Sequence, residues 1–284
     1  MPAIPFADSL GALGHAVAAA PLAVLSYPQI DPVLVRLGPL AIRWYALAYV
    51  AGLVLGWLYM RRLNRRHAKA MQAVDIDDFL VWATFGVVLG GRIGYVLFYN
   101  LPYYASQPLR ALEIWQGGMA FHGGLLGVIL AMLLFARRRG VPLLTLADLT
   151  ACATPIGLFF GRIANFINGE LYGRASDVPW AMVFPNGGPL PRHPSQLYEA
   201  GLEGLVLFLV MAWLAMRPGI FARRGTLAGC FLIGYAIARM SGELFRQPDV
   251  QIGYLEAGST MGQWLSLPML LGGLLLIWWA RRHA

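Results

Sequence analysis

Charged residues are scarce in this sequence of 284 residues. They make up 13% of it, against about 25% in soluble domains, and 58% of the residues are hydrophobic, with a mean hydropathy of +0.59. This composition excludes an ordinary soluble domain. Apolar runs near the ~20 residues that cross a bilayer as a helix recur along the chain. The predicted spans are 43–60, 79–100, 119–136, 149–168, 195–216, 226–245 and 262–280.

Backbone groups in lipid must pair internally, which leaves helices or a closed barrel as spanning structures. The runs are too long and too continuously apolar for barrel strands. We therefore expect an all-α integral membrane protein of about seven transmembrane helices.

Cysteine is almost absent, and metal-binding patterns are not found. Cys152 and Cys230 lie within apolar runs, where cysteine usually acts as a small hydrophobe. The five histidines lack the spacing of metal ligands, and the sequence has no P-loop, dinucleotide fingerprint or G-x-S-x-G motif. We expect neither a metal nor a cofactor.

Basic residues exceed acidic ones, giving a net charge of +8. Their distribution indicates membrane topology and not nucleic-acid binding, because 13 of the 22 Lys/Arg residues follow alternate spans. The positive-inside rule assigns these clusters to the cytoplasm, so the amino terminus is expected outside and the carboxyl terminus inside. The clusters are Arg61, Arg62, Arg65, Arg66 and Lys69; Arg137–Arg139; Arg217, Arg223 and Arg224; and Arg281 and Arg282.

The sequence shows no boundary of a soluble domain. Residues 1–42 are interpreted as an exterior arm; no Lys or Arg precedes Arg36, which argues against a cleaved signal peptide. Residues 43–284 form the membrane domain. Its longest exterior connection, 169–193, is rich in Gly and Pro and too long for a bare linker, so we expect a small exterior head there.

Polar residues at the end of the fourth span indicate an anion site. Arg162, Asn165 and Gly169 follow i, i+3, i+7 spacing, which predicts one shared helix face, and Glu170 follows. A guanidinium beside amide groups suits a phosphate, because its donors match the phosphate oxygens. The alternative is that Arg162 pairs with a carboxylate and locks helices together.

The sixth span carries a polar stripe of Tyr235, Arg239 and Glu243, spaced by four residues. Ionisable residues at this depth are costly and are functional candidates, although Glu243 could simply neutralise Arg239. His122 begins the third span among glycines, and histidine is well suited to accept a proton near neutral pH. The alternative is that His122 is a structural residue near a helix end. The segment HPSQLYE (193–199) either caps a helix or contributes to a site.

Seven segments together resemble the prolipoprotein diacylglyceryl transferase family of bacterial membrane enzymes. The most specific is GRIANFINGELYGR (161–174), and the resemblance extends from about residue 28 to the last helix. The other segments are RWYAL (43–47), LGGRIGYVLFYN (89–100), GGMAFHGG (117–124), RHPSQLYE (192–199), FLIGYAIAR (231–239) and ELFRQPD (243–249).

The resemblance implies a reaction in the bacterial inner membrane. The sn-1,2-diacylglyceryl group of phosphatidylglycerol passes to the lipobox cysteine of a prolipoprotein signal peptide, and sn-glycerol-1-phosphate is released. It implies essential roles for the residues matching His122, Arg162, Asn165, Gly173, Tyr235 and Arg239, and further roles for Tyr45, Glu170 and Glu243.

We expect His122, Arg239 and Tyr235 to be catalytic and the others to bind phosphatidylglycerol. Arg162 and Arg239 would hold the phosphate, and His122 would accept the thiol proton; Tyr235 or the lipid phosphate are alternative acceptors.

Two other functions fit parts of the sequence. A transporter or lipid flippase could use the membrane arginines to bind an anionic solute, and the repeat of GRIG (91–94) as GRIA (161–164) agrees weakly with the internal repeats of transporters. A structural membrane partner would use the same polar residues only to fix helix packing.

Overall fold

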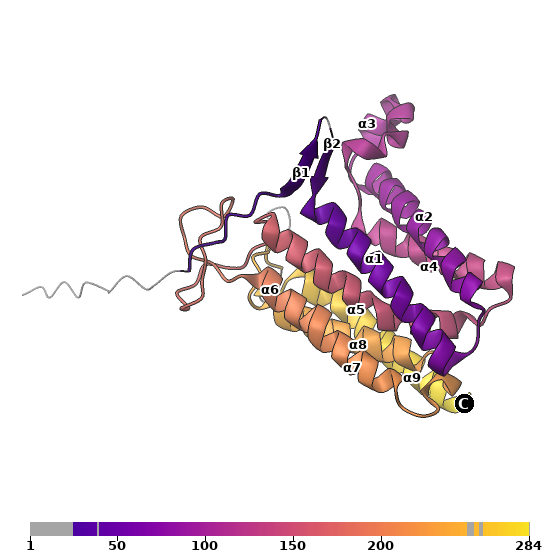
Figure 1. Cartoon of the computed structure of the whole chain (residues 1–284). Helices are drawn as coiled ribbons and strands as arrows, with labels where there is room; N and C mark the ends of the chain where they lie inside the picture. Colours follow the sequence, from indigo (N-terminus) through magenta and orange to yellow (C-terminus); the bar gives the residue numbers. More distant parts are fainter. Residues whose placement is uncertain (1–24, 39, 249–252, 256–257, 284) are drawn as a thin grey trace, which may run out of the picture.

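Long helices dominate the computed structural model, which describes residues 25–38, 40–248, 253–255 and 258–283 (Figure 1). Most of the expected arm, residues 1–24, lies outside the described residues. The end of the arm is an antiparallel hairpin of β1 (Val33–Leu37) and β2 (Leu40–Arg43). The hairpin was not predicted, because a four- or five-residue strand beside a long apolar run has no clear period of its own. It leads directly into the first long helix.

The long helices overlap all seven predicted runs. Five segments are long and apolar enough to cross a membrane: α2, α4, α5, the continuous α6–η4–α7 segment and α9. Helices α1 and α8 have 20 and 18 residues, but Arg61 and Arg62 in α1 and Arg239 and Glu243 in α8 lower their hydropathy. The bounds are α1 Trp44–Leu63, α2 Ala73–Phe98, α4 Phe121–Arg139, α5 Leu143–Ile167, α6 Ser195–Glu199, η4 Ala200–Val206, α7 Leu207–Ala215, α8 Thr226–Glu243 and α9 Met261–Arg282.

The outer surfaces of these helices are apolar. Phe85 on α2, Leu126 on α4 and Leu275 on α9 are each more than 60% exposed. Soluble proteins rarely expose large contiguous apolar surfaces, whereas lipid-facing helices do so along their length. The exposure pattern therefore agrees with a membrane protein.

The helices pack in two groups. Helices α2 and α4 pack mainly against each other, whereas α1 packs on α5, and α8 packs on α9 and α5. The α2–α4 contact depends on glycines: a Cβ atom on Gly90 would lie 2.4 Å from the carbonyl oxygen of Gly123, and one on Gly127 would lie 2.0 Å from that of Gly86. Small residues allow membrane helices to approach this closely.

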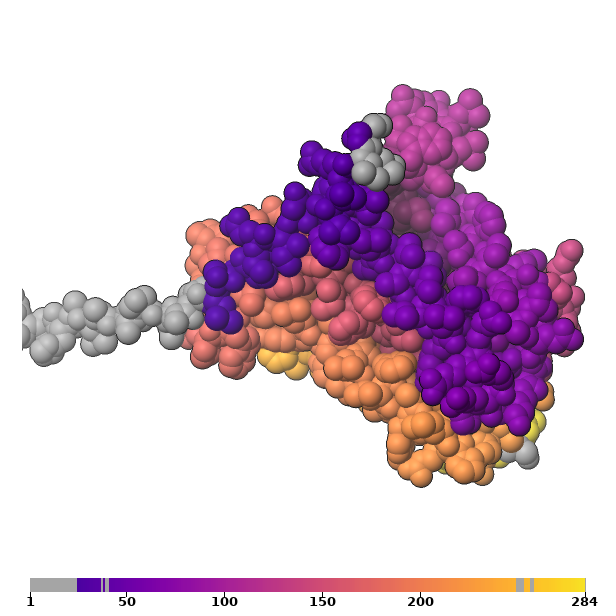
Figure 2. Space-filling view, in the orientation of Figure 1, coloured from indigo at the N-terminus to yellow at the C-terminus, as the bar shows by residue number. Residues whose placement is uncertain are grey.

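One end of the bundle carries the loops expected outside. Arg92 of α2 donates hydrogen bonds to the carbonyl oxygens of Ala111 (2.8 Å), Gly117 and Gly118, and so fixes the loop of α3 (Leu101–Ser106), η2 (Pro108–Leu112) and η3 (Ile114–Gln116). The segment between α5 and α6 lies at the same end, beside the extended chain that leads into β1 (Figure 1). Figure 2 shows the surface hollowed between the indigo hairpin and the magenta α2–α3 region.

Candidate active site

A close helix contact brings two charged segments together near the centre of the larger helix group. A Cβ atom on Gly204 of η4 would lie 2.7 Å from the Cα of Phe159 on α5, so glycine is needed for this approach. Glu203 precedes Gly204, and Arg162 lies one turn beyond Phe159. Segment η4 is a π-helix within an otherwise α-helical span, a feature frequent at functional sites.

Arg162 and Arg239 meet at the carboxylates of this segment. Arg162 Nη2 lies 3.0 Å from Glu203 Oε2, and its Nη1 lies 3.1 Å from Glu199 Oε2. Arg239 Nη1 lies 2.8 Å from Glu199 Oε1 and 3.5 Å from Glu203 Oε1, and Nη2 donates to Glu243 Oε1. Arg162 of α5 and Arg239 of α8 therefore each pair with a different oxygen of the Glu199 carboxylate.

Charge is balanced within this ion cluster, defined as Arg162, Arg239, Arg246, Glu199, Glu203 and Glu243. Arg246 joins it through Glu199, with Nη1 3.7 Å from Oε1. Three arginines and three glutamates give no net charge when all are ionised. Buried ions need such pairing, because desolvation alone costs several kcal/mol per ion. The Glu199 and Glu203 side chains are 0% exposed, whereas those of Arg162 and Arg239 are each 14% exposed.

Arg162 thus makes the contacts expected if it pairs with a carboxylate and locks helices together. Glu243 likewise pairs with Arg239, as expected if Glu243 neutralises that arginine. Tyr235, one turn before Arg239, has its own electrostatic interactions with Arg162, Arg239 and Glu203. The stripe predicted on α8 therefore faces the ion cluster.

A second polar group lies at the carboxyl end of α5. Asn165 Nδ2 donates to Glu170 Oε1 at 2.8 Å, and Tyr45 of α1 interacts with both residues. The main chain of Glu170 is held in turn, because Gln196 Nε2 donates to its carbonyl oxygen at 2.6 Å. The HPSQLYE segment thus positions the loop after α5 as well as starting a helix.

Gly169 does not share the face of Arg162 and Asn165, contrary to the spacing argument. Helix α5 ends at Ile167, and Gly169 adopts a positive φ of 64°. Glycine accepts this left-handed conformation without strain, and it commonly terminates helices. The chain therefore turns before the i+7 position is reached.

Gly173 occupies a crowded point between the α5–α6 connection and the residues that follow α8. A Cβ atom there would lie 2.6 Å from the carbonyl oxygen of Phe245 and 2.7 Å from that of His193. The Gly173 N–H donates to the His193 carbonyl at 2.9 Å. Burial lowers the pKa of His193 below its usual value. Gly173 thus has a packing role that its residue type alone explains.

His122 lies apart from the arginines in the contacts of the described residues. It is in the first turn of α4, which packs mainly on α2, and its exposed ring contacts Phe121 at a centroid distance of 5.6 Å. The structure therefore brings together Arg162, Arg239, Tyr235 and Glu243, and separately Asn165, Glu170 and Tyr45.

Known proteins are similar to this sequence over most of its length. The family model described as "Prolipoprotein diacylglyceryl transferase" matches residues 32–279. The chain belongs to this family. Similar proteins named phosphatidylglycerol–prolipoprotein diacylglyceryl transferase occur in Paramagnetospirillum magneticum, 62% identical over 91% of this chain and 97% of the relative, and in Rhodospirillum centenum, 60% identical over 89% and 92%. A Rhizobium meliloti relative is 57% identical over 93% and 96%.

The sequence analysis did not identify two carboxylates at the candidate site. Glu203 was not singled out, and Glu199 was noted only as part of a polar helix start. Their spacing of four residues on an apolar span is the same signal that marked Arg239 and Glu243. Two arginines within the membrane also require carboxylate partners, which Glu199 and Glu203 are placed to supply.

Proposed function

We propose that this chain transfers the sn-1,2-diacylglyceryl group of phosphatidylglycerol to the lipobox cysteine thiol of prolipoproteins, releasing sn-glycerol-1-phosphate. Membership of the family supports the reaction. The observation that carries the site assignment is the meeting of Arg162 and Arg239 on Glu199, with Nη–Oε distances of 3.1 and 2.8 Å. Two guanidinium groups from separate helices converge there, next to Tyr235.

The arginines suit the charge that develops in this reaction. The leaving glycerol phosphate gains negative charge as the C–O bond breaks, and preorganised cations in a poorly hydrated site stabilise such charge. Each guanidinium has five N–H donors, and Glu199 and Glu203 engage part of each set. The phosphate would bind at the exposed edge of each guanidinium, through the donors that the carboxylates leave available.

The attacking thiol must first lose its proton, because the thiolate is the nucleophile. We propose that His122 is the acceptor, with Tyr235 or the lipid phosphate as alternatives. His122 would meet the arginine-bound lipid only if the substrate lies between the α4 and α5 sides of the bundle. Asn165, Tyr45 and Glu170 would then contact the glyceryl headgroup from the head-side end of α5.

Glu243 and Gly173 would support phosphatidylglycerol binding from the end of α8. Glu243 pairs with Arg239 and would keep its guanidinium aimed at the phosphate. Gly173 allows the head to approach the Phe245 main chain. Both would act by positioning the neighbouring groups.

The proposed topology has seven spans in the bacterial inner membrane, with α1 and α8 added to the five most apolar segments. The arm and head would lie outside. Arginine pairs end α1 and α9, and three arginines end α4, which favours a cytoplasmic location for these ends. A fluorescent protein fused to the carboxyl terminus should fold and fluoresce in cells. An alkaline phosphatase fusion at the same point that is active instead would contradict this orientation.

The reaction itself is tested with purified protein, phosphatidylglycerol and a lipobox peptide. The expected product is the peptide heavier by one diacylglyceryl group, measured by mass spectrometry. A peptide with serine in place of the lipobox cysteine is the matched control and should remain unmodified. Binding or transport of phosphatidylglycerol without that mass increase would instead favour a transporter.

The site assignment is tested by Arg162→Lys and Arg239→Lys, which keep the charge but lose the guanidinium geometry. Each should lower the transfer rate by about 10²-fold or more, the size seen when one preorganised donor is removed. The control is Arg138→Lys, an exposed residue at the end of α4. Near-normal transfer by both site variants would refute the phosphate assignment, and full activity of His122→Gln would remove the base assignment alone.

A further inference from the structure

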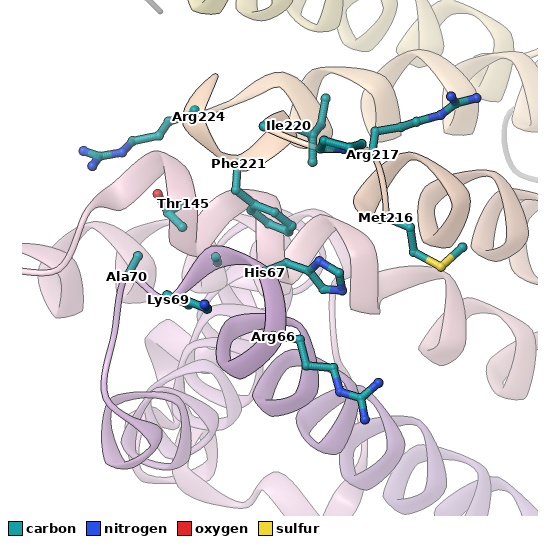
Figure 3. Close-up of a pocket in the computed structure, with 14 residues that line it drawn as sticks. Arg66, His67, Lys69, Ala70, Thr145, Met216, Arg217, Ile220, Phe221 and Arg224 are labelled. Carbon is teal, nitrogen blue, oxygen red and sulfur yellow. The ribbon is translucent and has the colours of Figure 1, made fainter.

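A basic pocket lies at the end of the bundle opposite the head. Its volume is about 740 Å³, and it is formed by η1 (Asn64–Ala68), the start of α5 and the connection through η5 (Ile220–Ala222). Figure 3 shows Lys69 and His67 below Thr145 and Phe221, with the side chains of Arg66 and Arg224 extending outward at the rim. None of the residues lining it is acidic. The pocket therefore favours an anion.

Thr145, in the first turn of α5, lines one side of this pocket. Helix α5 has 25 residues and begins after Pro142, whose side chain cannot cap it. The first N–H groups of a helix have no partner within the helix, and they carry the positive end of its dipole. A second pocket is lined by Leu143 and Leu144 and shares Ala222 and Arg224 with the first. The start of α5 thus borders two neighbouring pockets.

A buried hydroxyl group supplies independent evidence for a ligand. Thr145 lines the pocket and is 1% exposed, yet its Oγ1 has no hydrogen-bond partner among the described residues. An unsatisfied buried polar group destabilises the folded state, so the fold retains this hydroxyl at an energetic disadvantage. A ligand oxygen that accepts a hydrogen bond from the Thr145 hydroxyl would remove this disadvantage.

The loop opposite Thr145 is held in place by a buried asparagine. Asn64 is 4% exposed; its Nδ2 donates to the carbonyl of Met71 at 2.7 Å, and its Oδ1 accepts from the N–H groups of Ala70 and Met71. Lys69, just before them, adopts a positive φ of 47°. The nearest acid on α5, Asp148, is directed to α8, where it accepts from the N–H groups of Gly225 and Ala228.

We propose that this pocket binds a phosphate group, held by Thr145, the first turn of α5 and Lys69. Helix N-termini and lysine are common phosphate ligands. The phosphate could belong to the headgroup of an anionic phospholipid in the adjacent leaflet or to inorganic phosphate. The site is remote from the ion cluster, so it does not depend on the proposed transfer reaction.

The test uses the full-length protein in a neutral detergent. Thr145→Val with Lys69→Gln removes the hydroxyl and the amine, and the control pair Arg137→Gln with Arg138→Gln removes two exposed charges at the end of α4, outside the pocket. Native mass spectrometry measures phosphatidylglycerol binding against phosphatidylcholine, and thermal unfolding measures the effect of inorganic phosphate. The single variant Lys69→Gln, at an exposed position, serves if the double variant does not fold.

The pocket variant should lose one bound phosphatidylglycerol or bind it about tenfold more weakly, as expected for loss of a hydrogen bond to a charged group. The control pair should match the wild type. If inorganic phosphate raises the Tm of the wild type and the control but not of the pocket variant, free phosphate is a ligand as well. The proposal is overturned if both variants behave alike towards both probes, whatever their transfer activity.

Discussion

Gly204→Ala should disrupt the candidate site although Gly204 has no side chain that could contact the substrate. The added Cβ would lie 2.6 Å from the Cβ of Phe159, 2.7 Å from its Cα and 3.0 Å from its nitrogen. Carbon atoms prefer separations of about 3.5–4.0 Å, so η4 must move away from α5 by about 1 Å. Main-chain atoms cannot yield as a flexible side chain does, so the two elements must separate.

The size of the effect follows from that displacement. Overpacking costs about 1–3 kcal/mol, and a backbone collision belongs at the upper end, which lowers Tm by about 5 °C in a chain of this size. The Arg162–Glu203 distance of 3.0 Å would increase to about 4 Å, beyond hydrogen-bond range. Misplacement by 1 Å can reduce catalysis by about 10²-fold, and we expect a loss of transfer activity of that order.

Gly201→Ala is the matched control, because the same substitution in the same π-helical segment meets nothing within 4 Å. Replacing an unstrained glycine by alanine stabilises by about 0.4–1 kcal/mol, so Tm should hold or rise slightly. Thermal unfolding in detergent and the peptide transfer assay measure both variants. Equal Tm values and equal activities would refute the conclusion that η4 must contact α5 at Gly204.

Three further predictions concern other contacts. Glu199→Gln should cost about 3–5 kcal/mol by leaving buried arginines undercompensated, whereas Asp78→Asn in the half-exposed pair with Arg139 should cost less than about 1 kcal/mol; a similar Tm for the two would contradict the buried network. Arg92→Lys cannot reproduce the fork of hydrogen bonds to the loop between α2 and α4, so limited proteolysis should cleave 101–118 faster. Because burial lowers the pKa of His193, the unfolded chain binds its proton more readily, and stability is lost as pH falls below about 6.5; wild type should lose more Tm than His193→Gln between pH 7.5 and 5.5.

The helices were predictable because hydrophobic run length reports directly on bilayer thickness. The run predicted at 79–100 is α2, Ala73–Phe98, and the run at 119–136 is α4, Phe121–Arg139. The errors lie at the ends, where polar residues continue a helix beyond its apolar part. Helix α2 begins at Ala73 because Asp75 accepts from the Gln72 N–H at 2.9 Å, a capping contact that hydropathy does not detect.

The candidate site was predictable in its basic half only. Arg162 and Arg239 are conspicuous because each interrupts an apolar run, but the partner of each depends on helix packing. That packing depends on Gly204, whose residue type does not reveal which helix it contacts. The π-helical turn of η4 has no period that distinguishes it from an α-helix over seven residues. The fate of Arg92 shows the same limit, since it follows a glycine exactly as Arg162 does, yet it binds loop carbonyls.

Bracing helices and binding phosphate need not be alternative roles for Arg162 and Arg239. Preorganised charge stabilises a transition state because the protein has already fixed its position, and something must hold a guanidinium in place. The Glu199 and Glu203 side chains are fully buried, whereas both arginine side chains retain 14% exposure. The carboxylates thus form the inner layer of the ion cluster, and the arginines form its accessible side. A carboxylate in that position offsets the desolvation cost of burying each cation. It also directs the remaining guanidinium N–H donors towards an incoming anion.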